Sequence, residues 1–246
     1  MAHPLQSPRG AIFPYEAETG LKEAFFAGAN TGYFVEVGAN DPQVYSETWH
    51  LEQRGWTGVL VEPQPDLAEK IRQCRTAKVY AVACSSPANA GTAMPLNVAG
   101  IHSSLQDGFF VFGMKREGVL EVPVKTLDEV LIDAEAPAPL DFLSIDVEGH
   151  EIDVLDGFDM ARWRPRLLLI EDLAMNTRLH RLLLARGYKW IRRTGLNNWY
   201  VPADAPQQVG LLGRWQFVRK YYLGTPFRHL REMSRRLRAL ISGARS

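Results

Sequence analysis

Residues 140–151 read LDFLSIDVEGHE, an apolar run followed by ionisable side chains. The run 140–145 predicts a short buried strand, and Gly149 permits a sharp turn after it. The ionisable residues that follow the strand are Asp146, Glu148, His150 and Glu151. Because ligands bind at the carboxyl ends of strands in open α/β sheets, this edge is the first candidate for a functional site.

Further short strands are predicted on both sides of this stretch, and helices alternate with them. The predicted strands are 33–37, 58–61, 78–84, 140–145 and 167–170, with a closing hairpin from 188–192 and 199–201. The predicted helices are 18–27, 45–54, 66–75, one that begins at the capping box Thr126 to Glu129, one from Glu151, and 179–185. This alternation predicts an α/β fold with a central, mostly parallel sheet and a C-terminal antiparallel hairpin. Between 85 and 124 the periodicity fades, which indicates strand fragments and a loop.

The composition is that of a folded globular protein. The chain has 246 residues, of which 46% are hydrophobic and 23% charged, so one large domain with appendages is expected. Its cysteines, Cys74 and Cys84, show no spacing for a disulfide or zinc framework, which favours a reducing compartment. The N-terminal residues lack the apolar stretch of a secretory signal, and no run is apolar enough to span a membrane. We therefore expect a cytoplasmic protein.

The charge is divided unevenly along the chain. From Leu211 onward nine Lys and Arg residues stand against one acid, Glu232, a net charge of +8 that leaves −8 on residues 1–210. Within 213–246 apolar residues recur every three or four positions with arginines between them, which predicts a helix with an apolar and a cationic face. Such a helix suits an anionic membrane surface, at the inner face of the membrane, a partner protein, or its own domain. No nucleic-acid fold and no particular oligomeric state is indicated.

A glycine after the first predicted strand and an acid after the second are typical of sites for adenosine-containing cofactors. Gly38 and Glu62 occupy these positions. A dinucleotide site needs G-x-G-x-x-G, but the chain reads Gly-Ala-Asn-Asp-Pro-Gln from Gly38. S-adenosylmethionine has no pyrophosphate, so the spacing favours this methyl donor, with Glu36 near its positively charged end. The alternative for Glu36 is a helix-capping or buried, paired carboxylate.

Several motifs together resemble the FkbM family of methyltransferases. They are Phe34-Val35-Glu36-Val37-Gly38-Ala39-Asn40, Gly55-Trp56, Gly58-Val59-Leu60-Val61-Glu62-Pro63, Thr126-Leu127-Asp128, the stretch 141–151, and Leu155 with Gly157. The resemblance spans residues 33–202 and implies the class I methyltransferase (Rossmann-like) fold and S-adenosylmethionine as donor. By position it implies a cofactor pocket lined by Glu36, Gly38, Asn40 and Glu62, with Ser85 near the adenine. Pro42 and Glu47 depart from the family pattern in the first loop.

Two ways of activating an acceptor hydroxyl are open. Such a hydroxyl must lose its proton to a base, or a bound cation must lower its pKa. Glu148 and His150 are the candidate bases. Asp146, Glu171 and Asp172 follow neighbouring predicted strands and would form an oxygen site suited to Mg²⁺, as in metal-dependent O-methyltransferases that the arrangement resembles. The alternatives are that Asp146 caps the next helix and that Asp172 is a solvated loop residue.

The irregular segment before residue 113 contains candidate acceptor groups. His102-Ser103-Ser104 resembles an acceptor-side segment of the family, whose hydroxyls and imidazole would bind a polyol. Phe109, Phe110 and Phe112 would either cover the apolar face of a sugar or anchor the loop to the core.

These features predict an S-adenosylmethionine-dependent O-methyltransferase acting on a sugar hydroxyl of a glycan, glycolipid or glycosylated metabolite. The predicted parts are an N-terminal helical segment 1–30, a methyltransferase domain 31–205 and a basic amphipathic helical tail 206–246. The alternative is a non-catalytic Rossmann-like module that docks on lipid-linked glycan or a glycosyltransferase through the tail. The converging acids favour the enzyme, because a scaffold has no need of them.

Overall fold

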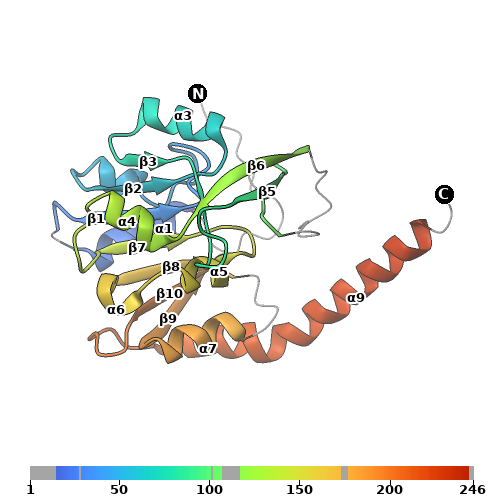
Figure 1. Cartoon of the computed structure of the whole chain (residues 1–246). Coiled ribbons are helices and arrows are strands. Elements are labelled where there is room, and N and C mark those ends of the chain that lie inside the picture. The colour runs from blue at the N-terminus through green and yellow to red at the C-terminus, as the bar shows by residue number, and fades with distance from the viewer. Residues whose placement is uncertain (1–14, 28, 101, 107–116, 173–176, 244–246) are drawn as a thin grey trace, which may run out of the picture.

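The computed structural model describes residues 15–243 apart from 28, 101, 107–116 and 173–176. The side chains of 15–17, 232 and 235–243 also lie outside the described part. Phe109, Phe110 and Phe112 are therefore among the residues that are not described. In the described part, a seven-stranded sheet forms the centre of the molecule, and a smaller sheet lies beside it (Figure 1).

The central sheet has the strand order β3-β2-β1-β7-β8-β10-β9. Its parallel strands are β1 (Tyr33–Val37), β2 (Thr57–Val61), β3 (Lys78–Tyr80), β7 (Phe142–Ile145) and β8 (Leu167–Glu171). The hairpin strands are β9 (Tyr188–Thr194) and β10 (Asn197–Pro202), and β10 pairs antiparallel with both β9 and β8. The predicted fold class, a mostly parallel sheet with a C-terminal antiparallel hairpin, is confirmed.

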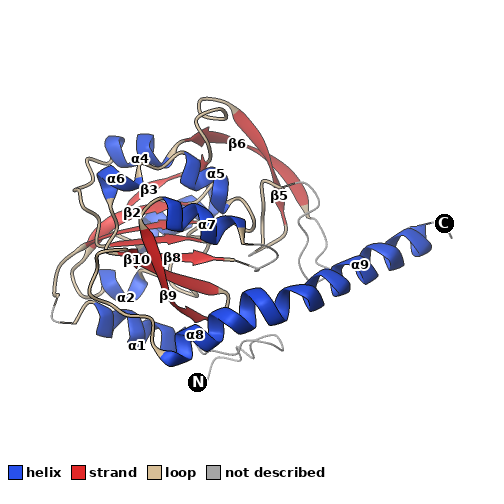
Figure 2. Cartoon of the chain, turned by 90° about the horizontal axis from the view of Figure 1, so that it is seen from below, coloured by secondary structure: helices blue, strands red, loops and turns tan. Residues whose placement is uncertain are grey.

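Both faces of the sheet are buried, because alternate residues of each strand point to opposite sides. Val35 and Val37 pack in the core of one face, and Phe34 packs in the core of the other. The helices of the first face are α4 (Leu127–Asp133), α5 (Glu151–Asp156), α6 (Met160–Trp163) and α7 (Arg178–Ala185). The helices of the second face are α1 (Tyr15–Phe25), α2 (Trp49–Glu52) and α3 (Pro65–Cys74). Figure 2 shows α4 to α7 above the sheet and α1 and α2 below it.

A second sheet, with the order β4-β6-β5, occupies the region where only strand fragments and a loop were predicted. Its strands are β4 (Ala83–Cys84), β5 (Ala93–Val98) and β6 (Gly118–Lys125). Its small core contains Ala83, Leu96, Val122 and Val124, too few apolar positions for a clear periodicity. The single strand predicted at 78–84 was wrong, because β3 and β4 belong to different sheets. The helix predicted at 45–54 is reduced to α2.

The carboxyl ends of four neighbouring strands are in register. Val61 pairs with Val37, Val37 with Ile145, and Ile145 with Ile170. The next residues along these strands are Glu62, Gly38, Asp146 and Glu171. We call this edge of the sheet the rim. The chain leaves β1 in one direction toward β2 and later returns to β7 on the other side, so the rim lies at a topological switch point, where ligands bind in open α/β sheets.

The C-terminal part of the described chain is helical. It consists of α8 (Leu211–Phe217), the π-helical segment η2 (Val218–Leu223) and α9 (Gly224–Gly243). We call these three segments the tail helix. α8 packs against β9, whereas α9 leaves the body of the molecule (Figures 1 and 2). Within the described part of the chain, no helix combines the length and the apolar character needed to cross a bilayer.

Candidate active site

Gly38 allows the ends of β1 and β7 to meet. Its φ is +89°, and a Cβ at this position would lie 1.8 Å from the backbone oxygen of Asp146. Any other residue would have to displace that carbonyl, so the close approach requires glycine. The Gly38 amide also donates to the carbonyl of Val61 at 2.9 Å. Gly38 was predicted because glycine lets the backbone approach a cofactor. The structure shows a second requirement, since only glycine lets Asp146 lie beside the turn after β1.

Glu62 organises the same turn. Its Oε2 accepts a hydrogen bond from the Asn40 amide at 2.8 Å, and its Oε1 accepts one from the Gln64 amide at 2.9 Å. Asn40 has a φ of +49°, a conformation that asparagine adopts more readily than most residues. Burial raises the pKa of Glu62, and the two amide donors oppose that shift. Each carboxylate oxygen retains a second lone pair that can accept a ribose hydroxyl.

A cavity of about 310 Å³ adjoins this turn. It is lined by Gln64, Pro65, Asp66, Val98, Glu117, Gly118, Val119 and Leu120. Its volume lies at the lower end of the range of small-molecule sites, about 300–1,000 Å³. A larger cavity of about 460 Å³, near Thr126 and Gly157, contains none of the predicted site residues. The smaller cavity contains none of them either, but one of its lining residues is Gln64, whose amide donates to Glu62.

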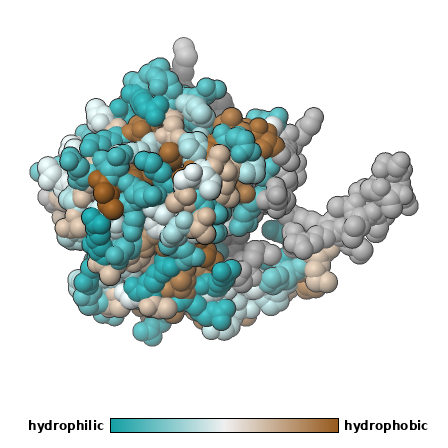
Figure 3. Space-filling model, viewed as in Figure 1, coloured by the Kyte–Doolittle hydropathy of each residue, from teal (hydrophilic) through white to brown (hydrophobic). Residues whose placement is uncertain are grey.

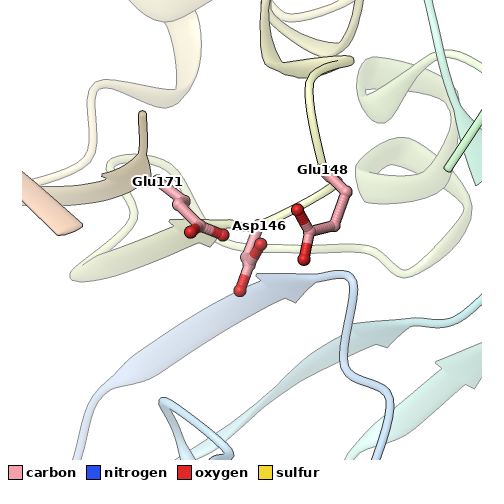
Figure 4. Close-up of side chains that lie close together, drawn as sticks. All are labelled: Asp146, Glu148 and Glu171. Atoms are coloured by element: carbon pink, nitrogen blue, oxygen red, sulfur yellow. The ribbon is translucent and has the colours of Figure 1, made fainter. Parts of the chain in front are cut away.

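Three carboxylates converge at the rim. Oxygen atoms of Asp146, Glu148 and Glu171 all lie within 4.8 Å of one another. Figure 4 shows the three side chains directed toward a common space, with Asp146 between the other two. We call these residues the carboxylate group. Two of them were predicted to meet because β7 and β8 are neighbours, and the register of these strands explains the meeting.

The carboxylate group holds protons more tightly than ordinary acids do. Burial, together with the charge of Asp146, raises the pKa of Glu148 to about 8. Burial also raises the pKa of Glu171 to about 7, although a hydrogen bond with Asp146 opposes the shift. The pKa of Asp146 is also raised, well above its usual value. The main cause is desolvation by the dense protein around it, and the second is the charge of Glu171, even though solvent reaches the residue. Near neutral pH these acids therefore share protons, or a cation must compensate their charge.

Glu148 is held in an unusual backbone conformation. Its φ is +52°, which costs a non-glycine residue on the order of 1 kcal/mol, and such residues cluster at active sites. The Ser104 hydroxyl donates to the Glu148 carbonyl at 2.7 Å. His102 Nδ1 lies in hydrogen-bonding contact with Glu148 Oε1, and Gln106 donates to the Gly149 carbonyl at 2.6 Å. The segment 102–106 thus lies against the turn after β7 and fixes the position of Glu148.

The comparison with protein families identifies this arrangement. A model described as the methyltransferase FkbM domain matches residues 36–190. The chain belongs to the FkbM methyltransferase family. Membership confirms the resemblance found in the sequence and implies S-adenosylmethionine as the methyl donor. Among curated proteins, the search found no significant match to the chain. The matched span contains every residue of the rim.

Glu36 of this FkbM methyltransferase lies on the α2 side of the sheet. Its oxygens accept hydrogen bonds from the Ser46 hydroxyl at 2.9 Å, from the Glu47 amide at 2.8 Å and from the Thr48 hydroxyl. The residue is buried, and burial raises its pKa while Thr48 and Arg75 oppose the shift. This placement corresponds to the alternative stated for Glu36, a buried carboxylate with protein partners, and the cofactor roles of Gly38, Asn40 and Glu62 stay predictions.

Ser85 and His150 are directed toward each other and away from the rim of the methyltransferase. Ser85 Oγ lies 2.9 Å from His150 Nε2, and His150 Nδ1 lies 3.5 Å from Asp153 Oδ2. Ser85 is fully buried, because it follows β4 of the second sheet and not β3. The adenine contact predicted for Ser85 and the base role predicted for His150 therefore do not fit this placement. Burial also lowers the pKa of His150, so the imidazole is neutral in the fold.

Asp172 lies apart from the carboxylate group. Its Oδ2 is 3.0 Å from Lys220 Nζ and accepts a hydrogen bond from the Tyr221 hydroxyl at 3.0 Å. Glu171 ends β8, and successive side chains along a strand point to opposite faces. The structure therefore places Asp172 apart from Glu171, and the described acids close enough to hold one cation together are Asp146, Glu148 and Glu171.

The sequence did not indicate the roles of three residues of the methyltransferase. Arg75 and Lys220 carried no local signal, because a basic residue on a helix is usually solvated, yet both are buried beside acids. His102 was considered only as an acceptor ligand. Its contact with Glu148 joins positions 46 residues apart, so no local pattern indicates it.

Proposed function

We propose that this methyltransferase methylates a sugar hydroxyl of a glycan, glycolipid or glycosylated metabolite, with Glu148 as the general base. The convergence of the carboxylate group beside Gly38 carries this proposal. A base works best when its pKa lies near the working pH, and the value of about 8 for Glu148 meets that condition. An unperturbed carboxylate would be too weak a base for an aliphatic hydroxyl.

The residues of the rim divide the work between them. When bound, S-adenosylmethionine supplies a methyl group on a positively charged sulfur. An acceptor oxygen can attack this methyl group and displace the sulfur. Glu62 accepts hydrogen bonds from the ribose hydroxyls, and the turn at Gly38 sets the position of the donor. Glu148 takes the proton that the acceptor hydroxyl loses, and His102 holds the Glu148 carboxylate in place. Positioning of the two reactants supplies much of the acceleration.

Polar groups beside Glu148 support a polyol acceptor. His102 and Ser103 are partly exposed, and Gln106 is exposed, along the segment that lies against the turn after β7. Their donors and acceptors suit the closely spaced hydroxyls of a sugar. An acceptor hydroxyl bound by these groups would lie next to the Glu148 carboxylate.

A divalent cation at the same carboxylates is the second candidate mechanism. Asp146, Glu148 and Glu171 offer the oxygen ligands that Mg²⁺ prefers. A cation would compensate their charges and lower the pKa of a bound hydroxyl, and Glu148 would then be a ligand. Under this mechanism Mg²⁺ raises the unfolding temperature of the wild type and leaves that of Glu171→Gln unchanged. Full activity after exhaustive chelation would exclude it.

Calorimetric titration with S-adenosylhomocysteine tests the cofactor assignment. We expect Glu62→Gln to weaken binding at least tenfold, because the amide removes one acceptor for the ribose hydroxyls. Glu69→Gln, at an exposed position of α3, is the matched control and should bind as the wild type does. Equal affinities of the wild type and Glu62→Gln, with an unchanged unfolding temperature, would contradict the assignment.

A panel of free, lipid-linked and glycosidic sugars then tests the acceptor. We expect methylated product, identified by mass spectrometry, whose new methyl group is on oxygen. A product methylated on nitrogen would refute the proposed acceptor. Tight binding of the donor without any methylated product would favour the non-catalytic module.

A further inference from the structure

The tail helix exposes an unusual number of large apolar side chains. Nine of them are exposed: Leu211, Leu212, Trp215, Val218, Tyr222, Leu223, Phe227, Leu230 and Met233. Leu211 is 84% exposed, Phe227 73% and Met233 67%. Leu211, Trp215, Val218 and Tyr222 follow one another at spacings of four and three, as residues on one side of a helix do. The described part of the tail helix therefore presents a continuous apolar stripe to solvent.

This stripe remains exposed although the opposite side of the helix is already packed. A Cβ at Gly213 would lie 2.7 Å from the carbonyl oxygen of Ile191, so α8 approaches β9 too closely for a larger residue. The Phe217 ring lies 4.8 Å from the rings of both His180 and Tyr221. Lys220 donates to Asn198 at 2.7 Å. The segments α8 and η2 are thus fixed to their own domain by one side, and the part of the apolar stripe that they carry points away from it.

Positive charge accompanies the stripe. Arg214, Arg219 and Arg231 are exposed on the tail helix, and the sequence places Arg235, Arg236 and Arg238 farther along it. Residues 1–210 carry −8, so they would be repelled by an anionic surface that attracts the tail. Figure 3 shows hydrophobic residues at several places on the domain and also at the lower right, where the tail helix leaves it beside hydrophilic residues. Charge and apolar surface therefore coincide on one element.

We propose that the apolar stripe and arginines of the tail helix dock on an anionic lipid surface. Apolar side chains flanked by arginines are what an interfacial helix needs, and Trp215 and Tyr222 suit the headgroup region. A bilayer is favoured over a second tail, because two tails of the same strong positive charge repel each other. Because Asp172 joins the tail to the end of β8, docking would hold the rim at a fixed distance from the lipid.

Sedimentation of the full-length protein with vesicles tests this proposal. The probes are vesicles of phosphatidylcholine alone and of phosphatidylcholine with phosphatidylglycerol, at about 0.15 M salt. We expect binding to the anionic vesicles that is stronger by at least tenfold. Replacing Arg214, Arg219 and Arg231 with Gln should weaken it on the order of 100-fold, from about fivefold for each arginine at the surface. Trp215→Ser with Phe227→Ser should weaken it as well.

A control of equal charge separates docking from general electrostatics. Arg54, Arg72 and Arg162 are exposed on the domain, and changing all three to Gln alters the net charge by the same amount. This variant should lose far less binding to anionic vesicles than the tail arginine variant does, because the domain arginines do not face the lipid. Each variant should keep the unfolding temperature and the affinity for S-adenosylhomocysteine of the wild type.

Three outcomes would overturn the proposal. The first is equal binding to neutral and anionic vesicles, and the second is equal loss in the tail and domain arginine variants. The third is a lipid-free dimer, detected by light scattering, that the Trp215→Ser and Phe227→Ser changes dissociate, because the stripe would then bind a second copy.

Discussion

Two groups of acids lie close to the ends of the central strands, and they differ in how their charge is compensated. Around Glu36 and Glu52, Arg75 supplies a buried cation that pairs with Glu52 and donates to Ser46 at 3.1 Å and Thr48 at 2.9 Å. The carboxylate group has no ion pair with an arginine of the described part of the chain, although the charge of Arg193 acts to lower the pKa of Glu171. Among the described residues, its ion pair within 4.0 Å is that of His102 with Glu148.

This difference separates structure from chemistry. The acids near Arg75 have partners for their charge: the pKa of Glu52 is lowered, and Thr48 and Arg75 oppose the rise that burial causes in the pKa of Glu36. In the carboxylate group, burial and then the repulsion between its members raise the pKa of all three acids. Strongly perturbed groups of this kind are characteristic of functional sites.

Glu148→Gln tests whether the carboxylate group takes part in catalysis. The amide keeps the shape of the side chain but cannot accept a proton, so we expect methyl transfer to slow by about 10²–10⁴-fold. The free energy of unfolding should stay the same or rise, because the repulsion with Asp146 is removed. Initial rates and thermal unfolding measure both effects. Glu121→Gln, at an exposed position of β6, should change neither. A stable, fully active Glu148→Gln enzyme would show that the base lies elsewhere.

Arg75→Met tests whether the acids near Arg75 stabilise the fold. The substitution removes the cation of a buried ion pair and leaves Glu52 uncompensated, which costs about 3–5 kcal/mol of unfolding free energy. Urea denaturation measures the loss. Arg72→Met on the same helix, where the side chain is exposed, should change stability by less than about 0.5 kcal/mol. Similar losses in both variants would mean that Arg75 compensates no buried charge.

The pH dependence of stability should distinguish the carboxylate group from the acids near Arg75. The pKa of Glu148, about 8, and that of Glu171, about 7, lie above the usual value, so the folded protein binds these protons more tightly than the unfolded chain does. Their stabilisation is complete below about pH 4.5 and is lost as the pH rises through about 8. We expect a loss of about 1–3 kcal/mol over this interval. The double variant Glu148→Gln with Glu171→Gln should lose less stability than the wild type over this interval, although the raised pKa of Glu151, about 8, and that of Glu18, about 7, still contribute.

Glu52 should show the opposite sign. Burial acts to raise its pKa, but hydrogen bonds from Thr76 and Arg75 outweigh burial, and the pKa is lowered. Its contribution is present above the ordinary carboxyl pKa and is lost as the pH falls below it. Denaturation of the wild type and the double variant between pH 4 and 9 separates the two groups. Identical pH profiles would contradict the distinction drawn between them.

The strands of the central sheet were largely predictable because burial on both faces requires continuous apolar runs. The run before Asp146 and the run before Glu171 each indicated a strand, and neighbouring parallel strands bring their ends together. The second sheet was not predicted, since its core has too few apolar positions to set a period. Ser85 was misplaced for the same reason, because it follows a strand of that sheet.

The amino-acid sequence by itself determined the fold class, the acids at the rim and the amphipathic, basic character of the tail. Each depends on local spacing, which a strand or helix converts directly into a shared edge or face. Only the tertiary structure decided which acids are compensated, because Arg75 reaches Glu52 across 23 positions and His102 reaches Glu148 across 46. Burial and pairing depend on contacts between distant segments, and these contacts determine whether a carboxylate stabilises the fold or remains available for chemistry.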